Sequence, residues 1–286
     1  MEQIIINGAI LGMNYALIAL GLTLIFAIMG VLNFAHGQMY VLGGFVTYYV
    51  FGVLELNFLL AVLASVAVLA VVGLVFERAF FRRVLRMSSR EESSMLLAAG
   101  TALLLESLIL IFFGEKQRGT PPIVTGVYQV FGAYVPASRA FVFTVALVAV
   151  VGFILFMQYT RPGRALRAIA QDKEVTALQG VNINRYNALG FAIGAGLTGL
   201  AGALLISIFA VNSGLGTAIS IKAFIMVMLG GAGVVSGAIA GAFVLGFAEA
   251  FGYAFLPGST TYLIIFIALI AFLVIRPHGI MGKPWG

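Results

Sequence analysis

Five polar side chains interrupt stretches of this sequence that are otherwise almost entirely apolar: Asn33, His36, Gln38, Glu106 and Glu249. The two glutamates fall inside long apolar runs, where a carboxylate is costly in hydrocarbon and tends to face an interior or an aqueous path. The other three form a polar break between two apolar runs. A broken helix frees backbone groups that protein or water must satisfy, and transporters often place their solute there. We therefore predict that these five residues line a translocation path through the membrane.

A purely structural role is the alternative for each of these residues. In that interpretation Asn33 and His36 cap helix ends near the membrane interface, where backbone groups lack helical partners. Glu106 and Glu249 would then each make a hydrogen bond between neighbouring helices. The sequence leaves both interpretations open.

Patterns that signal catalysis or a bound cofactor are missing from the sequence. The phosphate-binding pattern G-x-x-x-x-G-K-[ST] does not occur, and neither does H-E-x-x-H. With two histidines and no cysteine, a multi-histidine or thiolate metal site is not possible. We predict that the chain is not an enzyme and holds no cofactor or metal. Any ATP that drives its work would be hydrolysed by another chain.

A second group of candidate residues lies in a charged segment, where five basic and two acidic side chains fall between positions 161 and 185. Apolar runs on both sides hold this segment at the membrane surface, where a short charged helix could bind a soluble partner. Leucine and isoleucine three residues apart would share one face of such a helix. The candidates for partner contact are Arg164, Leu166, Arg167, Ile169, Asp172 and Glu174. An ordinary positively charged loop would explain the charge equally well.

Composition sets the class of protein. The chain is 62% hydrophobic and 9% charged, whereas about a quarter of an ordinary globular domain is charged. A water-soluble fold is therefore excluded, and we expect residues 1–286 to form a single integral membrane domain of several helices. Glycines four residues apart, which let helix backbones approach closely, predict tight packing at Gly8/Gly12, Gly190/Gly194 and Gly233/Gly237/Gly241.

Nine apolar runs are candidates for crossing the membrane, because a crossing helix needs about 20 residues. The second run is short and follows the polar break, and the seventh is interrupted by glycines, so either could be a half-membrane or re-entrant helix. We predict an all-α bundle with eight or nine transmembrane or half-membrane helices. The runs are 4–31, 38–54, 57–77, 95–113, 140–158, 188–211, 221–236, 238–256 and 260–275.

Basic residues predict the orientation of the bundle, since cytoplasmic loops collect Lys and Arg. Most of the sixteen Lys and Arg lie in the 78–90 loop, the 161–185 loop and the C-terminal tail, which we place in the cytoplasm. Nine crossings then put the N-terminus outside. Segment 114–138 would be external, and its alternating stretch at 127–131 indicates either a small hairpin or a plain exposed loop. The remaining basic residues fall on that opposite side: Lys116, Arg118, Arg139 and Lys222.

Four blocks of the chain resemble a known family. Segment 21–44, GLTLIFAIMGVLNFAHGQMYVLGG, is similar to the signature of LivH-type permeases of branched-chain amino acid ABC importers. The others follow in family order: RALRA at 164–168 with its continuation to 182, KAF at 222–224 through LGGAG at 229–233, and IRPHGI at 275–280. The family usually has a serine soon after the third glycine of LGGAG. Here it is delayed to Ser236, which puts any role of that hydroxyl in doubt.

The resemblance implies a type II-like ABC importer permease in the cell inner (plasma) membrane. Its substrate would be leucine, isoleucine, valine or a related small solute. Its partners would be a second related permease chain, two cytoplasmic ATPase subunits and a periplasmic solute-binding protein. The path would lie between the two permease chains, and segment 161–187 would be the coupling loop that docks on an ATPase.

Two other classes of function stay open from the sequence. A self-sufficient secondary transporter or channel would be expected to carry paired intramembrane acids and bases, and no span shows such a pair in the sequence, although Glu106 and Glu249 keep this class in consideration. A purely structural membrane scaffold would suit the glycine content but not the charged, proline-bounded segment.

Overall fold

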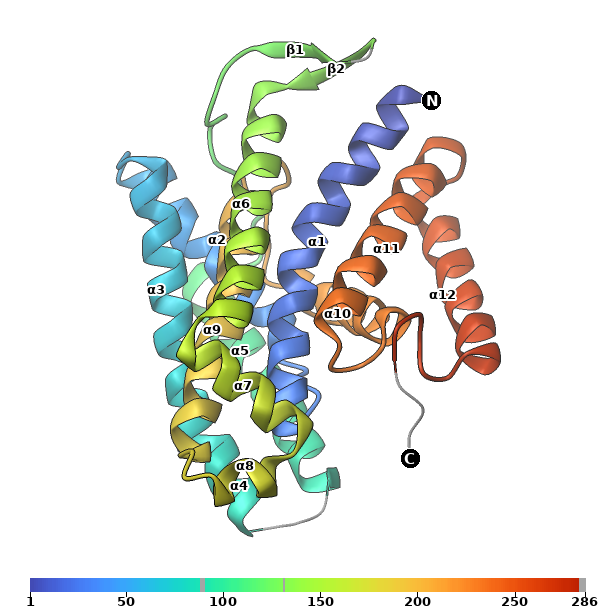
Figure 1. The fold of residues 1–286 in the computed structure, drawn as a ribbon. Coiled ribbons are helices and arrows are strands. Elements are labelled where there is room, and N and C mark those ends of the chain that lie inside the picture. The colour runs from blue at the N-terminus through green and yellow to red at the C-terminus, as the bar shows by residue number, and fades with distance from the viewer. Residues whose placement is uncertain (88–90, 131, 283–286) are drawn as a thin grey trace.

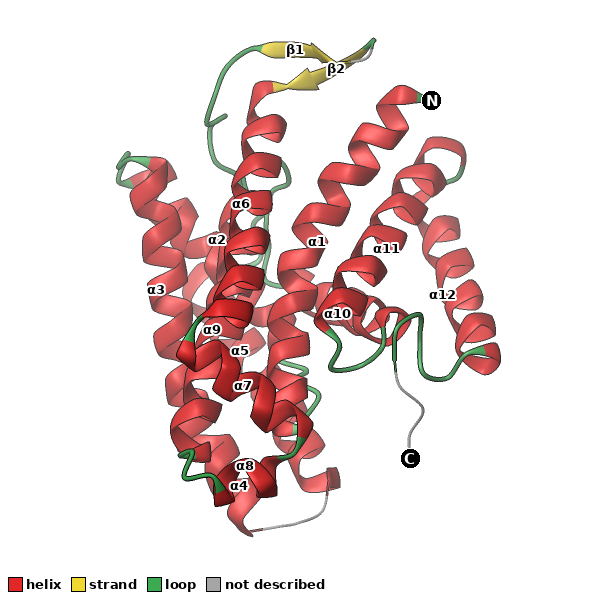
Figure 2. Cartoon of the chain, in the orientation of Figure 1, coloured by secondary structure: helices red, strands yellow, loops and turns green. Residues whose placement is uncertain are grey.

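The computed structural model describes residues 1–87, 91–130 and 132–282, and these residues are mostly helical (Figure 1, Figure 2). The first half contains α1 (Glu2–Met29), α2 (His36–Thr47), the π-helix η1 (Tyr48–Val53), α3 (Phe58–Phe76), the π-helix η2 (Glu77–Phe81), α4 (Arg82–Met87) and α5 (Glu91–Phe113). Two short strands follow, β1 (Val127–Val130) and β2 (Ala133–Pro136). The second half contains α6 (Ala137–Tyr159), α7 (Arg161–Gln171), α8 (Lys173–Leu178), α9 (Ile183–Leu205), α10 (Leu215–Gly230), α11 (Val235–Phe255) and α12 (Gly258–Ile275).

Each of the nine predicted apolar runs contains a helix, which confirms the all-α membrane bundle. Among the described residues, seven helices are long and apolar enough to span a membrane. The two remaining runs are shorter pieces at the predicted breaks. The second run is the 12-residue α2, which continues into η1, and the seventh is the 16-residue α10. Helix α10 begins at Leu215, six residues before the predicted start, and ends at Gly230.

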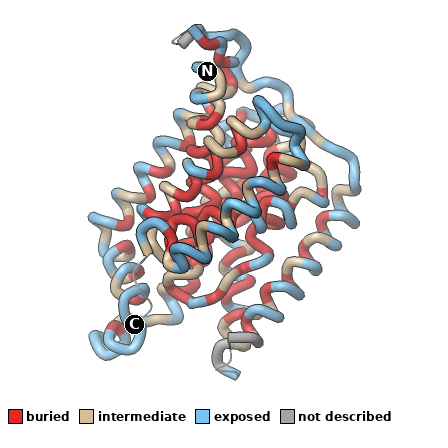
Figure 3. The backbone as a smooth tube through the Cα atoms, turned by 90° about the vertical axis from the view of Figure 1, so that its right-hand side faces the viewer, coloured by how far each residue is buried: buried red, intermediate tan, exposed pale blue. Residues whose placement is uncertain are grey.

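Helices α1 and α9 form the centre of the bundle. Both are apolar on all sides and buried along most of their length, as expected of a helix surrounded by protein. Helix α1 packs along α11 and α9, and α9 packs along α3 and α2. The buried residues gather in the middle of the molecule (Figure 3). Helices α3, α5, α6 and α12 lie around this centre and expose large apolar side chains, which suits contact with lipid or with another membrane protein.

Close backbone contacts at glycine hold these central helices together, as the glycine spacing predicts. A Cβ atom built on Gly194 of α9 would lie only 2.7 Å from the carbonyl oxygen of Gly21 of α1. One built on Gly246 of α11 would lie 2.5 Å from the backbone nitrogen of Gly12 of α1. Gly237 of α11 is similarly crowded by the backbone of Gly230. Alanine at any of these positions would push two helices apart.

The bundle has two different ends. One end carries the N-terminus and a β-hairpin in which Tyr128 pairs with Val135 (Figure 1). The alternating stretch therefore forms the hairpin rather than a plain loop. The other end carries α4, α7 and α8 (Figure 1). The two strongly basic loops of the sequence thus lie at the same end of the molecule.

Candidate functional site

The polar break lies deep in the bundle, between α1, α2 and α9. His36 is fully buried, and its Nε2 lies 2.9 Å from both the carbonyl oxygen of Ile18 and the hydroxyl of Thr198. Asn33 is also fully buried, and its side-chain oxygen accepts a hydrogen bond from the backbone N–H of Ala35. This contact tightens the turn that leads into α2. The second ring nitrogen of His36 and the side-chain nitrogen of Asn33 have no hydrogen-bond partner within the described part of the chain.

Backbone groups of the break are satisfied by α10. The hydroxyl of Ser220 accepts a hydrogen bond from the N–H of Gly37 at 2.9 Å and donates one to the carbonyl oxygen of Phe34 at 2.8 Å. One serine therefore bridges the last turn before α2 and its first turn. This bridge joins the two short helices, α2 and α10, at Gly37, where their backbones are in close contact.

Gln38 and Glu106 meet on the other side of α2. The side-chain amide of Gln38 donates to a carboxylate oxygen of Glu106 at 3.1 Å, and the hydroxyl of Thr217 in α10 donates to the same oxygen at 3.3 Å. Gln38 is buried, Glu106 is half-buried and Thr217 is exposed. Since most of α5 presents apolar side chains outward, this group is a polar spot on an otherwise apolar face.

Glu249 belongs to a separate cluster with a residue that sequence reasoning missed. Lys222 of α10 forms an ion pair with Glu249 of α11, with 2.9 Å between Nζ and Oε1. Tyr15 of α1 donates its hydroxyl hydrogen to Glu249 at 2.6 Å and accepts one from Lys222 at 2.8 Å. The ammonium of Lys222 also lies over the rings of Tyr15 and Tyr262. Four helices, α1, α10, α11 and α12, thus meet at one charge pair.

This cluster corrects two expectations. Lys222 does not lie in an external segment, because α10 starts earlier than predicted and places Lys222 in its middle. The sequence also showed no intramembrane acid paired with a base, yet Lys222 and Glu249 form such a pair. The two residues are 27 positions apart and separated by the break at 231–234, so only the packing of α10 against α11 brings them together.

A cavity of about 520 Å³ opens beside this ion pair. Lys222, Glu249 and Tyr15 lie on its wall, together with Tyr40, Tyr253 and Gln117. The rest of the wall is apolar and is contributed by Leu11, Leu205, Ile208, Phe209, Ala210, Leu215 and Ile219. A small set of polar groups in a mostly apolar cavity of this size is typical of sites for small molecules.

A smaller cavity of about 260 Å³ adjoins the first, and the two share five lining residues, including Leu11 and Tyr253. It extends to Asn7 and Arg139, whose side chains form a hydrogen bond at 3.1 Å. These two residues lie near the start of α1 and of α6, at the end of the bundle that carries the hairpin (Figure 1). The pair of cavities therefore leads from that end toward the Lys222–Glu249 pair.

The break between α10 and α11 is closed by the segment that follows α12. The N–H groups of Ile280 and Met281 donate to the carbonyl oxygens of Leu229 and Gly230, at 2.8 and 3.0 Å. These carbonyls end α10 and have no partner within that helix. Two sequence blocks separated by 40 residues or more, LGGAG and IRPHGI, thus form one structural unit.

The charged segment forms two short helices at the opposite end. Thr160 caps α7 by accepting from the N–H of Gly163, and Asp172 caps α8 by accepting from the N–H of Val175. The charged candidates Arg164, Arg167, Asp172 and Glu174 are all exposed. Leu166 and Ile169 are instead buried against the chain itself, with exposed fractions of 0% and 3%. The apolar stripe of α7 therefore anchors this helix and is not presented to a partner.

The apolar side chains that do face outward are on α8, where Val175 is 52% and Leu178 is 86% exposed. Sequence reasoning did not select them, because it took the apolar stripe of α7 as the outward face. Between α7, the end of α6 and residues 233–236 lies a further cavity of about 510 Å³, lined in part by Arg167 and Ser236. The surface helix α7 therefore borders the break that precedes α11.

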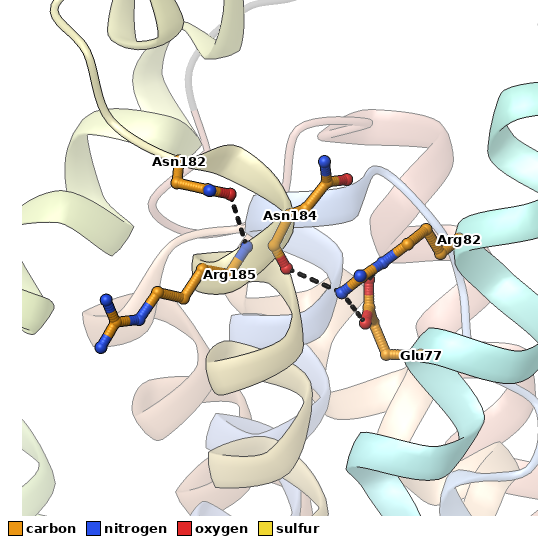
Figure 4. A network of polar contacts seen from close by, with 5 residues as sticks. All are labelled: Glu77, Arg82, Asn182, Asn184 and Arg185. Atoms are coloured by element: carbon orange, nitrogen blue, oxygen red, sulfur yellow. Dashed lines mark hydrogen bonds and ion pairs between the residues drawn. The ribbon is translucent and has the colours of Figure 1, made fainter.

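An arginine joins the two basic loops. Arg82 makes two hydrogen bonds to the carboxylate of Glu77, at 3.0 and 2.6 Å, and one to the carbonyl oxygen of Asn184 at 3.0 Å (Figure 4). Glu77 is almost completely buried. Asn182 starts α9 beside it by capping the N–H of Arg185 at 3.1 Å (Figure 4). Arg82 therefore ties η2, at the end of α3, to the start of α9.

No group of three or more His, Asp and Glu side chains that could bind a metal ion gathers among residues 1–87, 91–130 and 132–282. The polar groups of the site are hydroxyls, amides, one imidazole, two carboxylates and one ammonium. This set can bind and orient a charged solute.

Comparison with known proteins gives a consistent result. The chain matches the family described as the branched-chain amino acid transport system permease component over residues 4–273. The high-affinity branched-chain amino acid transport system permease protein LivH of Escherichia coli (strain K12) is 32% identical, over 99% of this chain and 96% of its own. BraD of Pseudomonas aeruginosa, with the same description, is 34% identical over the same shares. The probable permease LivH of Methanocaldococcus jannaschii is 29% identical, over 99% and 94%.

Among solved structures, PsaBC from Streptococcus pneumoniae in complex with Fab aligns with a TM-score of 0.48 at 16% identity, covering 95% of this chain and 91% of that one. This likeness is too loose to support an argument. The family match and the relatives cover nearly the whole chain, and they confirm the resemblance found in its four sequence blocks. The chain is a multi-pass membrane protein that belongs to the family of permease components of branched-chain amino acid transport systems.

Proposed function

We propose that this chain is the membrane permease subunit of an ATP-driven importer of leucine, isoleucine and valine or closely related amino acids. It would form the translocation path with a second, related permease chain in the cell inner (plasma) membrane. Two cytoplasmic ATPase subunits would supply the energy, and a periplasmic solute-binding protein would deliver the substrate. The match to the permease family over residues 4–273 carries this proposal.

The path residues proposed from the sequence fall into two layers. Glu249 lies beside the large cavity, and Glu106 with Gln38 at the polar spot on the α5 face; in this proposal they meet a solute or the second permease chain. Asn33 and His36 form the second layer and are fully buried. We propose that these two residues hold the broken helix whose outer side borders the path.

Coupling to the ATPases is proposed for the α7–α8 end, which we place in the cytoplasm with the loop at 78–90. Arg164, Arg167, Asp172 and Glu174 would supply charged contacts, and the exposed Leu178 an apolar one. Leu166 and Ile169 would contribute by holding α7 against the bundle. A movement of α7 caused by the ATPases would then be transmitted to α9 and α1, which α7 contacts.

Reconstitution tests the function as a whole. Purified alone in proteoliposomes, the chain should neither hydrolyse ATP nor accumulate labelled leucine. With the second permease, the ATPases and the loaded binding protein, the same vesicles should take up leucine only when ATP is present. Uptake by the chain alone, driven by a proton or sodium gradient, would show that it is a secondary transporter instead. The Lys222–Glu249 pair makes that rival worth testing directly, because it is an acid–base pair inside the membrane domain.

Charge changes on α7 and α8 test the coupling role. Arg167→Glu and Glu174→Lys should reduce co-purification of the ATPases and ATP-driven uptake, while membrane insertion is kept because the spans are untouched. Asp172→Asn is a matched comparison for Asp172→Lys, since asparagine keeps the cap of α8 and removes only the charge. If all four variants bind the ATPases and transport as the unaltered chain does, the segment is an ordinary charged loop.

A further inference from the structure

The Lys222–Glu249 pair is hard to explain as a stabilising contact alone. Removing two charges from water costs several kcal/mol per ion, and their attraction often only balances that cost. The side chains are 11% and 1% exposed, so the cost falls mainly on the buried carboxylate of Glu249. An ionisable group in a membrane domain is usually retained for function.

The pair also has binding capacity left over. A carboxylate can accept several hydrogen bonds and an ammonium can donate three. Glu249 Oε2 receives hydrogen bonds from Tyr15 and Lys222, and Oε1 is contacted by the Lys222 ammonium at 2.9 Å, which leaves further lone pairs of the carboxylate able to accept. Both charged groups line the 520 Å³ cavity, so a ligand there would meet one positive and one negative group side by side.

The cavity wall beside the charges favours one chemical class of ligand. Leu205, Ile208, Phe209 and Ile219 make it apolar, and among the described residues no charged side chain other than Lys222 and Glu249 lines it. A small molecule that carries an ammonium and a carboxylate at one end and a branched hydrocarbon at the other would match both parts. That is the structure of an aliphatic α-amino acid.

We propose that Lys222, Glu249 and Tyr15 form a binding site for the headgroup of an aliphatic α-amino acid during its passage. Lys222 binds the substrate carboxylate, Glu249 binds its ammonium, and the hydroxyl of Tyr15 holds the two protein groups in place. The apolar wall receives the substrate side chain. The adjoining cavity that reaches Asn7 and Arg139 provides the approach from the hairpin end. This inference rests on the proposed permease function and names the substrate contacts within it.

Uptake kinetics of the complete complex test the site. The double variant Lys222→Gln/Glu249→Gln keeps two side chains that can hydrogen-bond to each other and to Tyr15, but it loses both charges. It should assemble with the other subunits, while its KM for leucine rises about tenfold or more, as expected when hydrogen bonds to charged groups are lost. Gly100→Ala is the control for mutagenesis and purification, because a Cβ at this position of α5 meets no atom within 4 Å; the complex that carries it should transport leucine normally. A double variant with unchanged leucine kinetics would overturn the site and leave the permease function standing.

A labelling experiment tests the same site without relying on transport or on the double variant. The chain has no cysteine, so Ile219→Cys places a single thiol on the cavity wall. Leucine should slow its reaction with a small water-soluble thiol reagent. Two analogues that each lack one charge, 3-methylbutylamine and 4-methylpentanoate, should not. Equal labelling rates with and without leucine would contradict the site. If the unaltered complex fails to import leucine but leucine still protects the thiol, the proposed importer function fails and the site stands.

Discussion

At the scale of single residues, two ion pairs connect helices that are separated in the sequence. Lys222 and Glu249 connect two helices on either side of a break, and Tyr15 adds a third helix. Arg82 and Glu77 connect the end of the α3 segment to the start of α9 through the carbonyl of Asn184. In each pair the carboxylate is 1% exposed, so the loss of its basic partner would leave a buried negative charge.

The Arg82 contact leads to an asymmetric prediction. Arg82→Ala leaves Glu77 buried without its partner and also breaks the tie to Asn184, so it should cost about 3–5 kcal/mol of stability. Glu77→Ala should cost clearly less, because Arg82 is 25% exposed and can turn toward water while keeping its bond to Asn184. Thermal unfolding of the purified protein in detergent measures both.

Arg185→Ala is the control for this comparison, since Arg185 is exposed and its bond to Asn182 uses only the backbone nitrogen. Its melting temperature should match that of the unaltered protein. Equal melting temperatures for Arg82→Ala and Glu77→Ala would contradict the role assigned to the buried carboxylate.

At the scale of elements, the short helices α2 and α10 are the parts that differ most from simple membrane spans. They touch at Gly37 and Gly216, where the backbones are in direct contact, and Ser220 bridges them. The sequence predicted where these helices break, because polar residues and glycines interrupt apolar runs locally. It could not predict their contact, which depends on how two distant segments pack.

Gly37→Ala should therefore destabilise the bundle. A Cβ at this position would collide with the carbonyl oxygen of Gly216 and lie 2.6 Å from the nitrogen of Ser220. Overpacking of this kind typically costs about 1–3 kcal/mol. Gly100→Ala in α5 meets nothing within 4 Å and should be neutral or stabilising, by up to about 1 kcal/mol, through helix propensity. Thermal unfolding in detergent compares the two. Equal melting temperatures for Gly37→Ala and Gly100→Ala would mean that α2 and α10 are not in close contact.

The surface helix α7 shows a second limit of sequence reasoning. Its amphipathic spacing correctly indicated a helix with one apolar stripe at Leu166 and Ile169. The same spacing is produced by a helix that packs on its own chain and by one that presents its stripe to a partner. The periodicity shows which face of the helix is apolar, but it does not show whether the same chain or another protein covers that face. The ion pair of Lys222 with Glu249 was missed for a related reason, since nothing local in the sequence links residues 27 positions apart.

At the scale of the whole molecule, charge and structure divide the bundle into two dissimilar ends. The hairpin and the approach to the large cavity lie at one end, and the helices with exposed charge lie at the other (Figure 1). This arrangement suits a protein that receives a solute on one side of a membrane and mechanical work on the other.

Cysteine labelling in intact cells tests that orientation. Tyr134→Cys in the hairpin and Leu178→Cys in α8 would each introduce one thiol at a position that is 66% or 86% exposed. A membrane-impermeant maleimide should label Tyr134→Cys in intact cells and Leu178→Cys only after permeabilisation. Labelling of Leu178→Cys in intact cells would invert the orientation proposed from the basic loops.

The hydrogen bonds from Ile280 and Met281 to the end of α10 have a consequence for the order in which the protein is made. Helix α10 is synthesised before α11 and α12, yet its last carbonyl groups acquire these partners only after residue 281 has left the ribosome. Until then these two carbonyl oxygens lack the hydrogen-bond donors that they have in the completed bundle. Closing this joint is among the last steps in building the bundle. The last turn of α10 thus acquires its final hydrogen bonds from the far end of the chain.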